Sequence, residues 1–264
     1  MPYAVSDDGI KLYYESDGEG PVLVFLHGGN GNTLSWVFQI PHFRKNYRCI
    51  AVDLRTYKHS KCPVEQYHVL RFAGDLLAVL DHAGVDRAAL VCQSLGAFAG
   101  LPFALKYPQR VSALFINGSP TPAYSPENWE LLEKSYRIVM ATRRGELPVA
   151  NATGISPRFM AEQPALTFLY ESLTRLNGER RTTTMSEEEV KLYPKHFEGY
   201  RTPTLIAGGV HDNFLTPTHH MHIAGLVPGA TTHTFQNSGH SAYWEEPEEF
   251  NRVVETFLKQ HGWG

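Results

Sequence analysis

Three side chains of the types that perform nucleophilic catalysis occur along the chain in the order serine, aspartate and histidine. Ser94 lies in the stretch "VCQSLGAFAG", Asp212 follows "TLIAGGVH", and His240 lies in "NSGHSAYWEEP". A serine hydroxyl is a weak nucleophile at neutral pH, so it needs a base to take its proton and a carboxylate to orient that base. We therefore predict that Ser94 attacks a substrate carbonyl, that His240 is the general base, and that Asp212 orients the imidazole.

Two backbone N–H groups are candidates for stabilising the negative oxygen that develops when a carbonyl is attacked. Gly29 lies in the turn "HGG" that follows the apolar run "VLVFL", and Leu95 directly follows Ser94. Preorganised N–H groups of this kind contribute strongly to transition-state stabilisation. We therefore predict that the amides of Gly29 and Leu95 form an oxyanion hole.

The elements that must position these groups follow from the hydrophobic pattern. Apolar runs ended by turn formers predict strands in "KLYYESDG", "PVLVFLHGG", "YRCIAVDL", "AALVCQS", "VSALFING" and "PTLIAGG". Between them, "HVLRFAGDLLAVLDHAG" predicts a helix with Leu70, Ala73, Leu77 and Leu80 on one face and a C-cap at Gly84. This alternation predicts an α/β fold with a mostly parallel sheet, and the reactive residues should meet at the carboxyl-terminal edge of that sheet.

Residues 120–201 break this alternation. The stretches "ENWELLEKSYRIVMATRRG" and "PRFMAEQPALTFLYESLTRLNG" have helical patterns with no buried strand between them. We therefore predict a helical insertion over residues 120–201 and a core built from residues 1–119 and 202–264. Aromatic side chains in the insertion and after the "HGG" turn either line an apolar substrate pocket or pack helices together. The pocket candidates are Trp36, Phe38, Trp129, Tyr136, Phe159, Phe168 and Tyr170.

Several motifs in this order resemble those of the α/β-hydrolase family, whose chain order is also serine, acid, histidine. The "HGG" at residues 27–29 matches the family's oxyanion turn, Gly209 to Asp212 matches its G-x-x-D acid turn, and "GHSAYWEEP" matches its terminal histidine motif. The stretch "DLRTYKHS" resembles the family's D-x-R-G-x-G-x-S loop. The resemblance implies an α/β-hydrolase fold with a helical cap. It also implies a serine hydrolase that cleaves a small, hydrophobic carboxylic ester or lactone through an acyl-enzyme.

The resemblance leaves the reaction open. The same triad in this family also serves carbon–carbon bond hydrolysis of ring-fission diketones, and the sequence does not decide between the two reactions. A non-enzymatic ligand receptor on the hydrolase scaffold is the alternative from another class of protein. Among the motif residues, we expect His27, Asp53 and Arg55 to order loops rather than to react.

Two departures from the family pattern occur where glycine is usual. Cys92 replaces a glycine of the G-x-S-x-G elbow, but its small apolar side chain can meet the same size requirement. Thr56 and Lys58 replace both glycines of the loop "DLRTYKHS". We therefore expect this loop to avoid the backbone conformations that glycine adopts readily and other residues do not.

Composition argues against several other functions. The 264 residues carry a net charge of -3, which gives no electrostatic footprint for nucleic acid. Neither a signal-peptide pattern nor a run of about 18 apolar residues occurs, so we expect a cytoplasmic protein without a membrane partner. The residues His211, His219, His220 and His222 lack a completing carboxylate or thiol, so we expect neither a metal nor a cofactor. The partner is then a small-molecule substrate, bound by a monomer or a homodimer.

Overall fold

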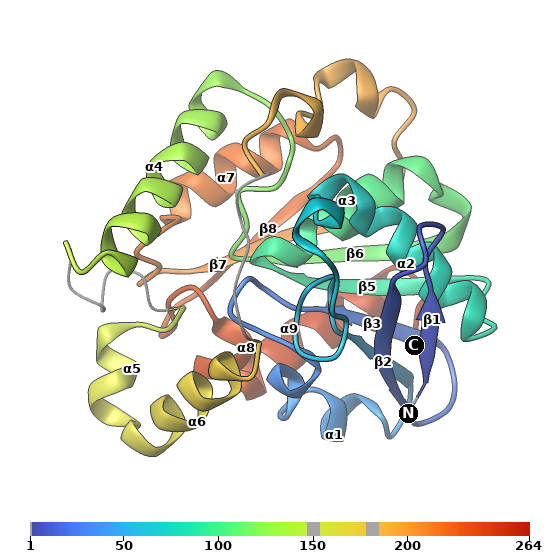
Figure 1. The fold of residues 1–264 in the computed structure, drawn as a ribbon, viewed down its shortest axis with the longest axis horizontal. Coiled ribbons are helices and arrows are strands. Elements are labelled where there is room, and N and C mark those ends of the chain that lie inside the picture. The colour runs from blue at the N-terminus through green and yellow to red at the C-terminus, as the bar shows by residue number, and fades with distance from the viewer. Residues whose placement is uncertain (1, 147–153, 178–184) are drawn as a thin grey trace.

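A mostly parallel β-sheet forms the centre of the molecule (Figure 1). The structure, a computed structural model, describes residues 2–146, 154–177 and 185–264. In these ranges the sheet has eight strands in the order β1-β2-β4-β3-β5-β6-β7-β8. The strands are β1 (Tyr3–Val5), β2 (Lys11–Asp17), β3 (Val22–Leu26), β4 (Arg48–Val52), β5 (Ala88–Gln93), β6 (Val111–Asn117), β7 (Thr204–Gly209) and β8 (Thr231–Phe235).

The strand directions bring distant parts of the chain to one edge of the sheet. Strands β1 and β2 are antiparallel to their neighbours, whereas β4, β3, β5, β6, β7 and β8 run parallel to one another. At the carboxyl-terminal ends, Gln93 of β5 pairs with Asn117 of β6, and Asn117 pairs with Ala207 of β7. The predicted α/β fold with a mostly parallel sheet is therefore confirmed.

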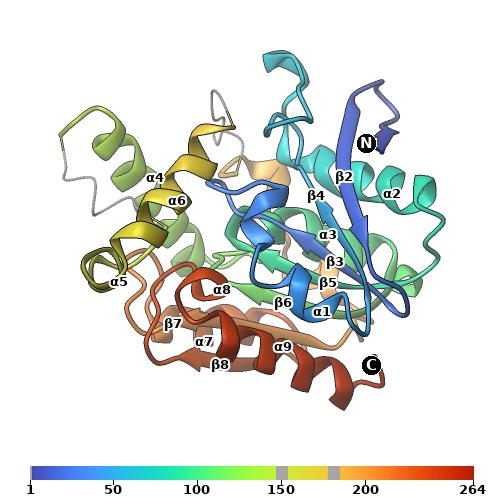
Figure 2. The same cartoon turned by 90° about the horizontal axis from the view of Figure 1, so that it is seen from below.

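Successive residues of a strand point to opposite faces of the sheet. Because the central strands are apolar at nearly every position, both faces of the sheet are apolar, and helices cover both. On one face, Val24 and Leu26 share a core cluster with apolar residues of α2 (Phe72–His82), α3 (Ala97–Lys106) and α7 (Pro217–Leu226). On the other, Leu23 and Phe25 share a cluster with residues of α1 (Ile40–Phe43), α8 (Ala242–Glu245) and α9 (Pro247–Gln260). Figure 2 shows the sheet between α2 and α9.

The buried face of α2 differs from the prediction. The helix begins at Phe72, and Leu70 lies before it in a 3₁₀ turn with 51% of its surface exposed. The apolar side chains that the helix buries are Phe72, Ala73, Leu76, Val79 and Leu80, and the predicted Leu77 is half-buried against the same core. Leu70 was wrongly placed on this face because the 3₁₀ turn that precedes the helix has a different periodicity from the helix itself.

The helices between β6 and β7 lie on one side of the molecule (Figures 1 and 2). They are α4 (Pro126–Arg143), α5 (Pro157–Glu162) and α6 (Pro164–Arg175). Each begins with a proline. Proline is favourable in the first turn because an N–H group there would have no partner within the helix. The described parts of residues 120–201, which we call the inserted segment, contain only an isolated bridge between Ala123 and Leu192 instead of a strand.

Candidate active site

Ser94 lies at a strained turn between β5 and α3. Its φ is +47°, and residues Ser94 to Gly96 form a 3₁₀ turn that leads directly into the helix. A residue other than glycine with positive φ is uncommon, and such conformations cluster at functional sites. A Cβ at Gly96 would overlap the Leu26 carbonyl oxygen, so α3 can approach β3 this closely only with glycine at that position.

Cys92, on the strand side of this turn, fits without a steric clash. Its side chain is completely buried, and a Cβ at Gly100 of α3 would overlap its sulfur. Gly100 therefore provides the space that the cysteine needs, and the elbow tolerates a thiol where the family pattern has glycine. Burial raises the pKa of the Cys92 thiol far above its ordinary range, so this group is not a thiolate nucleophile at neutral pH.

His240 and Asp212 form a buried hydrogen-bonded pair at the ends of β8 and β7. The Nδ1 atom of His240 donates to Asp212 Oδ2 at 2.9 Å. The other carboxylate oxygen of Asp212 accepts from the backbone N–H groups of Phe214, at 2.7 Å, and Leu215, at 3.0 Å. With Nδ1 donating to the carboxylate, Nε2 of His240 is the nitrogen left to take a proton from another group.

Each member of this pair also stabilises the charged form of the other. Burial disfavours the ionised form of Asp212, yet the neighbouring His240 and a backbone N–H donor lower the pKa of this carboxyl below its ordinary value. Burial likewise disfavours protonation of His240, but the charge and hydrogen bond of Asp212 outweigh it and raise the pKa of the imidazole. A base of raised pKa beside an ionised carboxylate is suited to general-base chemistry near neutral pH.

Two polar side chains at the ends of β5 and β6 hold the backbone of His240. Gln93 Nε2 donates to the His240 carbonyl oxygen at 2.9 Å, and Asn117 Nδ2 donates to the same oxygen at 3.2 Å. Asn117 Nδ2 also donates to Gln93 Oε1 at 2.6 Å. The sequence analysis missed both residues, although a polar side chain at the end of a buried apolar strand is the signal that points to them.

The "HGG" turn packs directly against the serine elbow. A Cβ at Gly28 would lie 3.2 Å from the Cβ of Ser94, so glycine permits this approach. His27 is completely buried, its Nε2 accepts from the Leu54 N–H at 3.0 Å, and its Nδ1 donates to the Gly28 carbonyl at 2.8 Å. Burial lowers the pKa of His27 to about 4, so the ring is neutral and orders the turn that contains Gly29.

The loop after β4 contradicts the expectation from its missing glycines. Thr56 has φ +76° and Lys58 has φ +39°, so both adopt the left-handed conformations that the sequence analysis did not expect of them. Between them, the Tyr57 ring packs on His27 with 4.8 Å between ring centroids. Tertiary contacts thus hold a loop whose local preference is different.

The motif residues of this loop have clear structural partners. Asp53 accepts a hydrogen bond from the Thr33 N–H at 2.7 Å and one from the His59 N–H at 3.2 Å. Arg55 is completely buried and forms ion pairs with Asp8 and Asp75. These contacts connect the loop to the neighbouring turns and to α2.

Two of the predicted pocket residues differ sharply in exposure. Trp36 is 1% exposed, and its ring packs between Phe25 and Tyr243 in the core. Phe168 is 66% exposed on α6, with the Arg175 guanidinium 5.8 Å from its ring. For both side chains, a role in the pocket stays a prediction.

The remaining pocket candidates are buried or half-buried. Phe38 packs on Trp244 of α8, and Trp129 of α4 packs on Tyr124. Phe159 of α5 belongs to the same core cluster as Phe38, and Tyr136 of α4 is half-buried. Tyr170 of α6 is buried and packs on Trp244. For these five side chains, a role in the pocket stays a prediction.

The histidines near β7 and α7 point in different directions. His219 caps the first turn of α7 through Thr216, whereas His222 pairs with Ser125 and Glu127 beside α4. His220 is buried on the opposite side of the helix, with its Nε2 4.0 Å from Asp212 Oδ2. In the part of the chain that the structure describes, no three His, Cys, Asp or Glu side chains form a metal-binding group.

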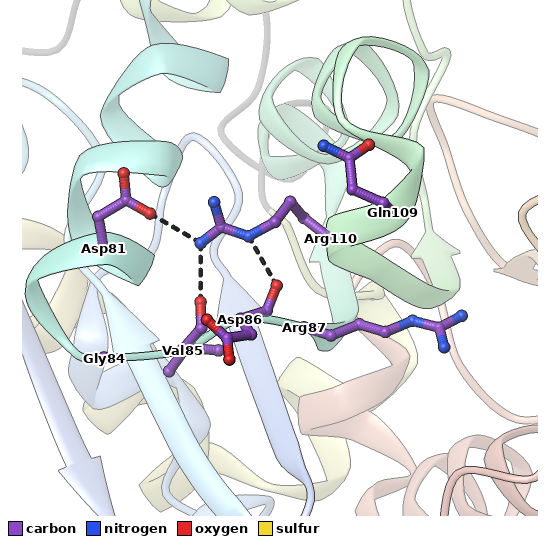
Figure 3. A pocket seen from close by; sticks show the side chains of 7 residues that line it. All are labelled: Asp81, Gly84, Val85, Asp86, Arg87, Gln109 and Arg110. Atoms are coloured by element: carbon purple, nitrogen blue, oxygen red, sulfur yellow. Dashed lines mark hydrogen bonds and ion pairs between the residues drawn. The ribbon is translucent and has the colours of Figure 1, made fainter.

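A groove of about 450 Å³ lies far from Ser94, at the amino-terminal ends of β5 and β6 (Figure 3). The guanidinium of Arg110 crosses it and donates to the carbonyls of Val85 and Asp86 and to the carboxylate of Asp81. This arginine is satisfied by the fold, and the groove contains neither a nucleophile nor a histidine.

Comparison with known proteins agrees with this geometry. The model of the α/β hydrolase fold family matches residues 21–247, so the chain belongs to the α/β-hydrolase family. The 2-hydroxy-6-oxononadienedioate/2-hydroxy-6-oxononatrienedioate hydrolase of Burkholderia vietnamiensis is 29% identical, covering 97% of this chain and 94% of that protein. The 3-oxoadipate enol-lactonase 2 of Acinetobacter baylyi is 23% identical, covering 95% and 94%.

The structural comparison gives a similar result. The solved structure of Est816, an N-acyl homoserine lactone degrading enzyme, matches with a TM-score of 0.81 and 27% identity, covering 97% of this chain and 100% of that one. The protein is therefore a hydrolase of this fold. In the described ranges, no helix is long and apolar enough to cross a membrane.

Proposed function

We propose that the protein is a serine hydrolase in which Ser94 is the nucleophile, His240 the general base and Asp212 the orienting acid. The observation that carries this proposal is the strained backbone of Ser94 at the end of β5. The adjacent strand-end residue Gln93 holds the backbone of the histidine that is paired with Asp212. A strained serine at the same edge of the sheet as a histidine–carboxylate pair is what a serine hydrolase needs to activate a hydroxyl for attack on a carbonyl.

In the proposed mechanism, His240 Nε2 takes the proton of the Ser94 hydroxyl while the oxygen attacks the substrate carbonyl. The amides of Gly29 and Leu95 stabilise the resulting oxyanion. The tetrahedral intermediate then collapses, the bond to the leaving oxygen breaks, and His240 protonates that oxygen. A water molecule, deprotonated by His240, hydrolyses the acyl-enzyme and restores the Ser94 hydroxyl. All the groups needed come from one chain, so a monomer or a homodimer suffices, and no cofactor takes part.

We also propose that the inserted segment is a cap over this site, with residues 1–119 and 202–264 as the core. Tyr170 of α6 supports the cap assignment, because its hydroxyl lies 3.2 Å from the hydroxyl of Ser241, the residue after His240. The backbone N–H of Ser156 also donates to Glu245, five residues after His240. These contacts join the inserted segment to the loop that carries the histidine and to the helix α8 that follows it.

The proposed substrate is a small, uncharged ester or lactone with a hydrophobic acyl group. The 27% identity to a lactone-degrading enzyme supports this choice.

Carbon–carbon bond hydrolysis of a ring-fission diketone is the second candidate. The observation that favours it is the similarity to the Burkholderia vietnamiensis hydrolase, at 29% identity over nearly the full length of both chains. The same nucleophile and base would serve, but the bond that breaks joins two carbons. A substrate of that kind is anionic, so it would require cationic groups at the site.

A parallel substrate panel tests the two candidates. We expect purified protein to hydrolyse short p-nitrophenyl esters or acyl homoserine lactones at least tenfold faster than a 2-hydroxy-6-oxo-dienoate. We also expect a fluorophosphonate to label Ser94, as located by peptide mass spectrometry. Faster cleavage of the dienoate would select the second candidate. Absence of both turnover and labelling would refute the serine mechanism itself.

A further inference from the structure

The last turn of α6 is hydrogen-bonded to the loop that carries Gly29. Thr174 Oγ1 donates to the carbonyl oxygen of Asn30 at 2.9 Å. The side-chain amide of Asn177, two residues after the helix ends, donates to the same oxygen at 3.2 Å. The residue next to the proposed oxyanion donor is thus held by the inserted segment, across more than 140 residues of sequence.

A second set of hydrogen bonds joins Asn32, in the same loop as Gly29, to the end of α6. Asn32 Nδ2 donates to the Leu173 carbonyl at 2.9 Å and to Asn177 Oδ1 at 3.0 Å. Asn32 and Asn177 are buried, and each side-chain amide has different partners for its oxygen and its nitrogen. Buried polar groups that are fully satisfied in this way fix one local geometry.

The same face of α6 also reaches the loop of the general base. Tyr170 lies one turn before Thr174, and its hydroxyl contacts Ser241 Oγ. Thr167, Tyr170 and Thr174 are the buried residues of this helix, and Asn177 continues the stripe at helical spacing. The helix therefore presents one buried polar stripe to two catalytic loops, and leaves Phe168, Leu169 and Leu176 exposed.

We propose that Thr174 and Asn177 are positioning residues of the oxyanion hole, and that α6 sets the orientation of the Gly29 amide. This inference rests on the proposed function, in which that amide stabilises the oxyanion. His27 holds the turn from the core side through the Gly28 carbonyl, and Thr174 and Asn177 hold it from the side of the inserted segment. A donor contributes to catalysis only if it is aimed before the reaction begins, so loss of either support should weaken it.

Thr174→Val tests the inference because it removes the hydroxyl and keeps the volume of the side chain. We expect kcat for the best ester of the panel to fall about tenfold with KM unchanged, less than the loss from deleting a donor outright. The affinity for an aryl trifluoromethyl ketone, whose adduct with Ser94 carries the oxyanion, should fall by the same factor. Thr174→Ser keeps the hydroxyl and should retain wild-type values.

Thr167→Val is the matched control. Thr167 is buried on the same helix, but its hydroxyl has no hydrogen-bond partner within the described ranges, so this variant should keep both the kcat and the ketone affinity. An equal loss in Thr167→Val would show a general effect of helix packing and overturn the inference.

Asn177→Ala provides an independent test and should reduce kcat and ketone affinity at least as much as Thr174→Val. Wild-type values in both variants would overturn the inference while leaving the proposed function intact. Failure of the proposed function shows itself separately, as absence of turnover and labelling in the wild type. If Asn177→Ala does not fold, the comparison of valine with serine at Thr174 decides alone.

Discussion

Among the turns at the carboxyl-terminal edge of the sheet, those after β5 and β4 both have positive φ at residues other than glycine. In one, Ser94 follows β5 with φ +47°. In the other, Thr56 and Lys58 follow β4 with φ +76° and +39°. Such conformations cost on the order of 1–3 kcal/mol each, so both turns are held against local preference by their surroundings.

The turns differ in what the strain supports. At Ser94 it carries a hydroxyl on the proposed nucleophile elbow, so the side chain and the conformation are both needed. At Thr56 it brings the neighbouring Tyr57 onto His27, and the side chain of Thr56 itself has no part in that contact. Backbone strain at this edge of the sheet therefore serves two purposes. At Ser94 the strained residue itself is needed, whereas at Thr56 we expect glycine to be an adequate replacement.

The largest effect should come from placing glycine at the elbow. We expect Ser94→Gly to lower kcat by a factor on the order of 10⁴ or more, because the nucleophile is gone. The same variant should be more stable than Ser94→Ala by about 1 kcal/mol, because glycine relieves the positive φ. Ester kinetics and urea unfolding measure the two quantities. Equal stability of the two variants would show that the elbow is unstrained.

The pH dependence of kcat/KM should report the protonation of His240. Its pKa is raised above its ordinary value of about 6.5, so the free base is lost as the pH falls through a midpoint above that value. We expect kcat/KM to fall about tenfold per pH unit below the midpoint. In Asp212→Asn, the charge that raises the pKa is absent, so the midpoint should move to lower pH. Thr56→Gly should leave it unchanged, and a wild-type midpoint well below 6.5 would contradict the assignment.

Two substitutions next to the elbow should compensate for each other in stability. Gly100→Ala should destabilise the protein by about 2 kcal/mol, because the new methyl group overlaps the Cys92 sulfur. The cost should largely disappear in the double variant with Cys92→Gly, whereas Gly96→Ala should stay destabilising in both backgrounds. Cys92→Gly alone should retain activity. A double-mutant cycle by urea unfolding measures the coupling, and additive effects would refute it.

The smallest effect should come from glycine in the other turn. We expect Thr56→Gly to be more stable than Thr56→Ala by about 1 kcal/mol, since alanine keeps the strain and glycine relieves it at the cost of some chain entropy. Ester turnover should stay within twofold of the wild type in both variants. A loss of activity in Thr56→Gly alone would mean that the threonine side chain itself contributes to the site.

Much of the fold could be predicted from local patterns. Apolar runs ended by turn formers predicted the parallel strands and the serine elbow, because burial and turn chemistry act within a few residues. The His240–Asp212 pair could also be anticipated, since parallel strands bring their carboxyl ends to one edge.

Contacts between distant segments could not be predicted in this way. Gln93 and Asn117 hold His240 across 147 and 123 residues of sequence. On α6, the structure buries Thr167, Tyr170 and Thr174, whereas the apolar Phe168 and Leu169 are exposed. Which face of such a helix is buried depends on the surface it meets, and that surface comes from elsewhere in the chain.

The sequence by itself determined the types and order of the reactive groups and the elements that end beside them. Only the tertiary structure decided how firmly each is held: Cys92 fits because Gly100 makes room, Thr56 keeps a glycine-like conformation, and α6 supports the loop of Gly29. The physical reason is that strand and turn preferences are local free energies. Buried hydrogen bonds and close packing are set by partners that the fold brings together.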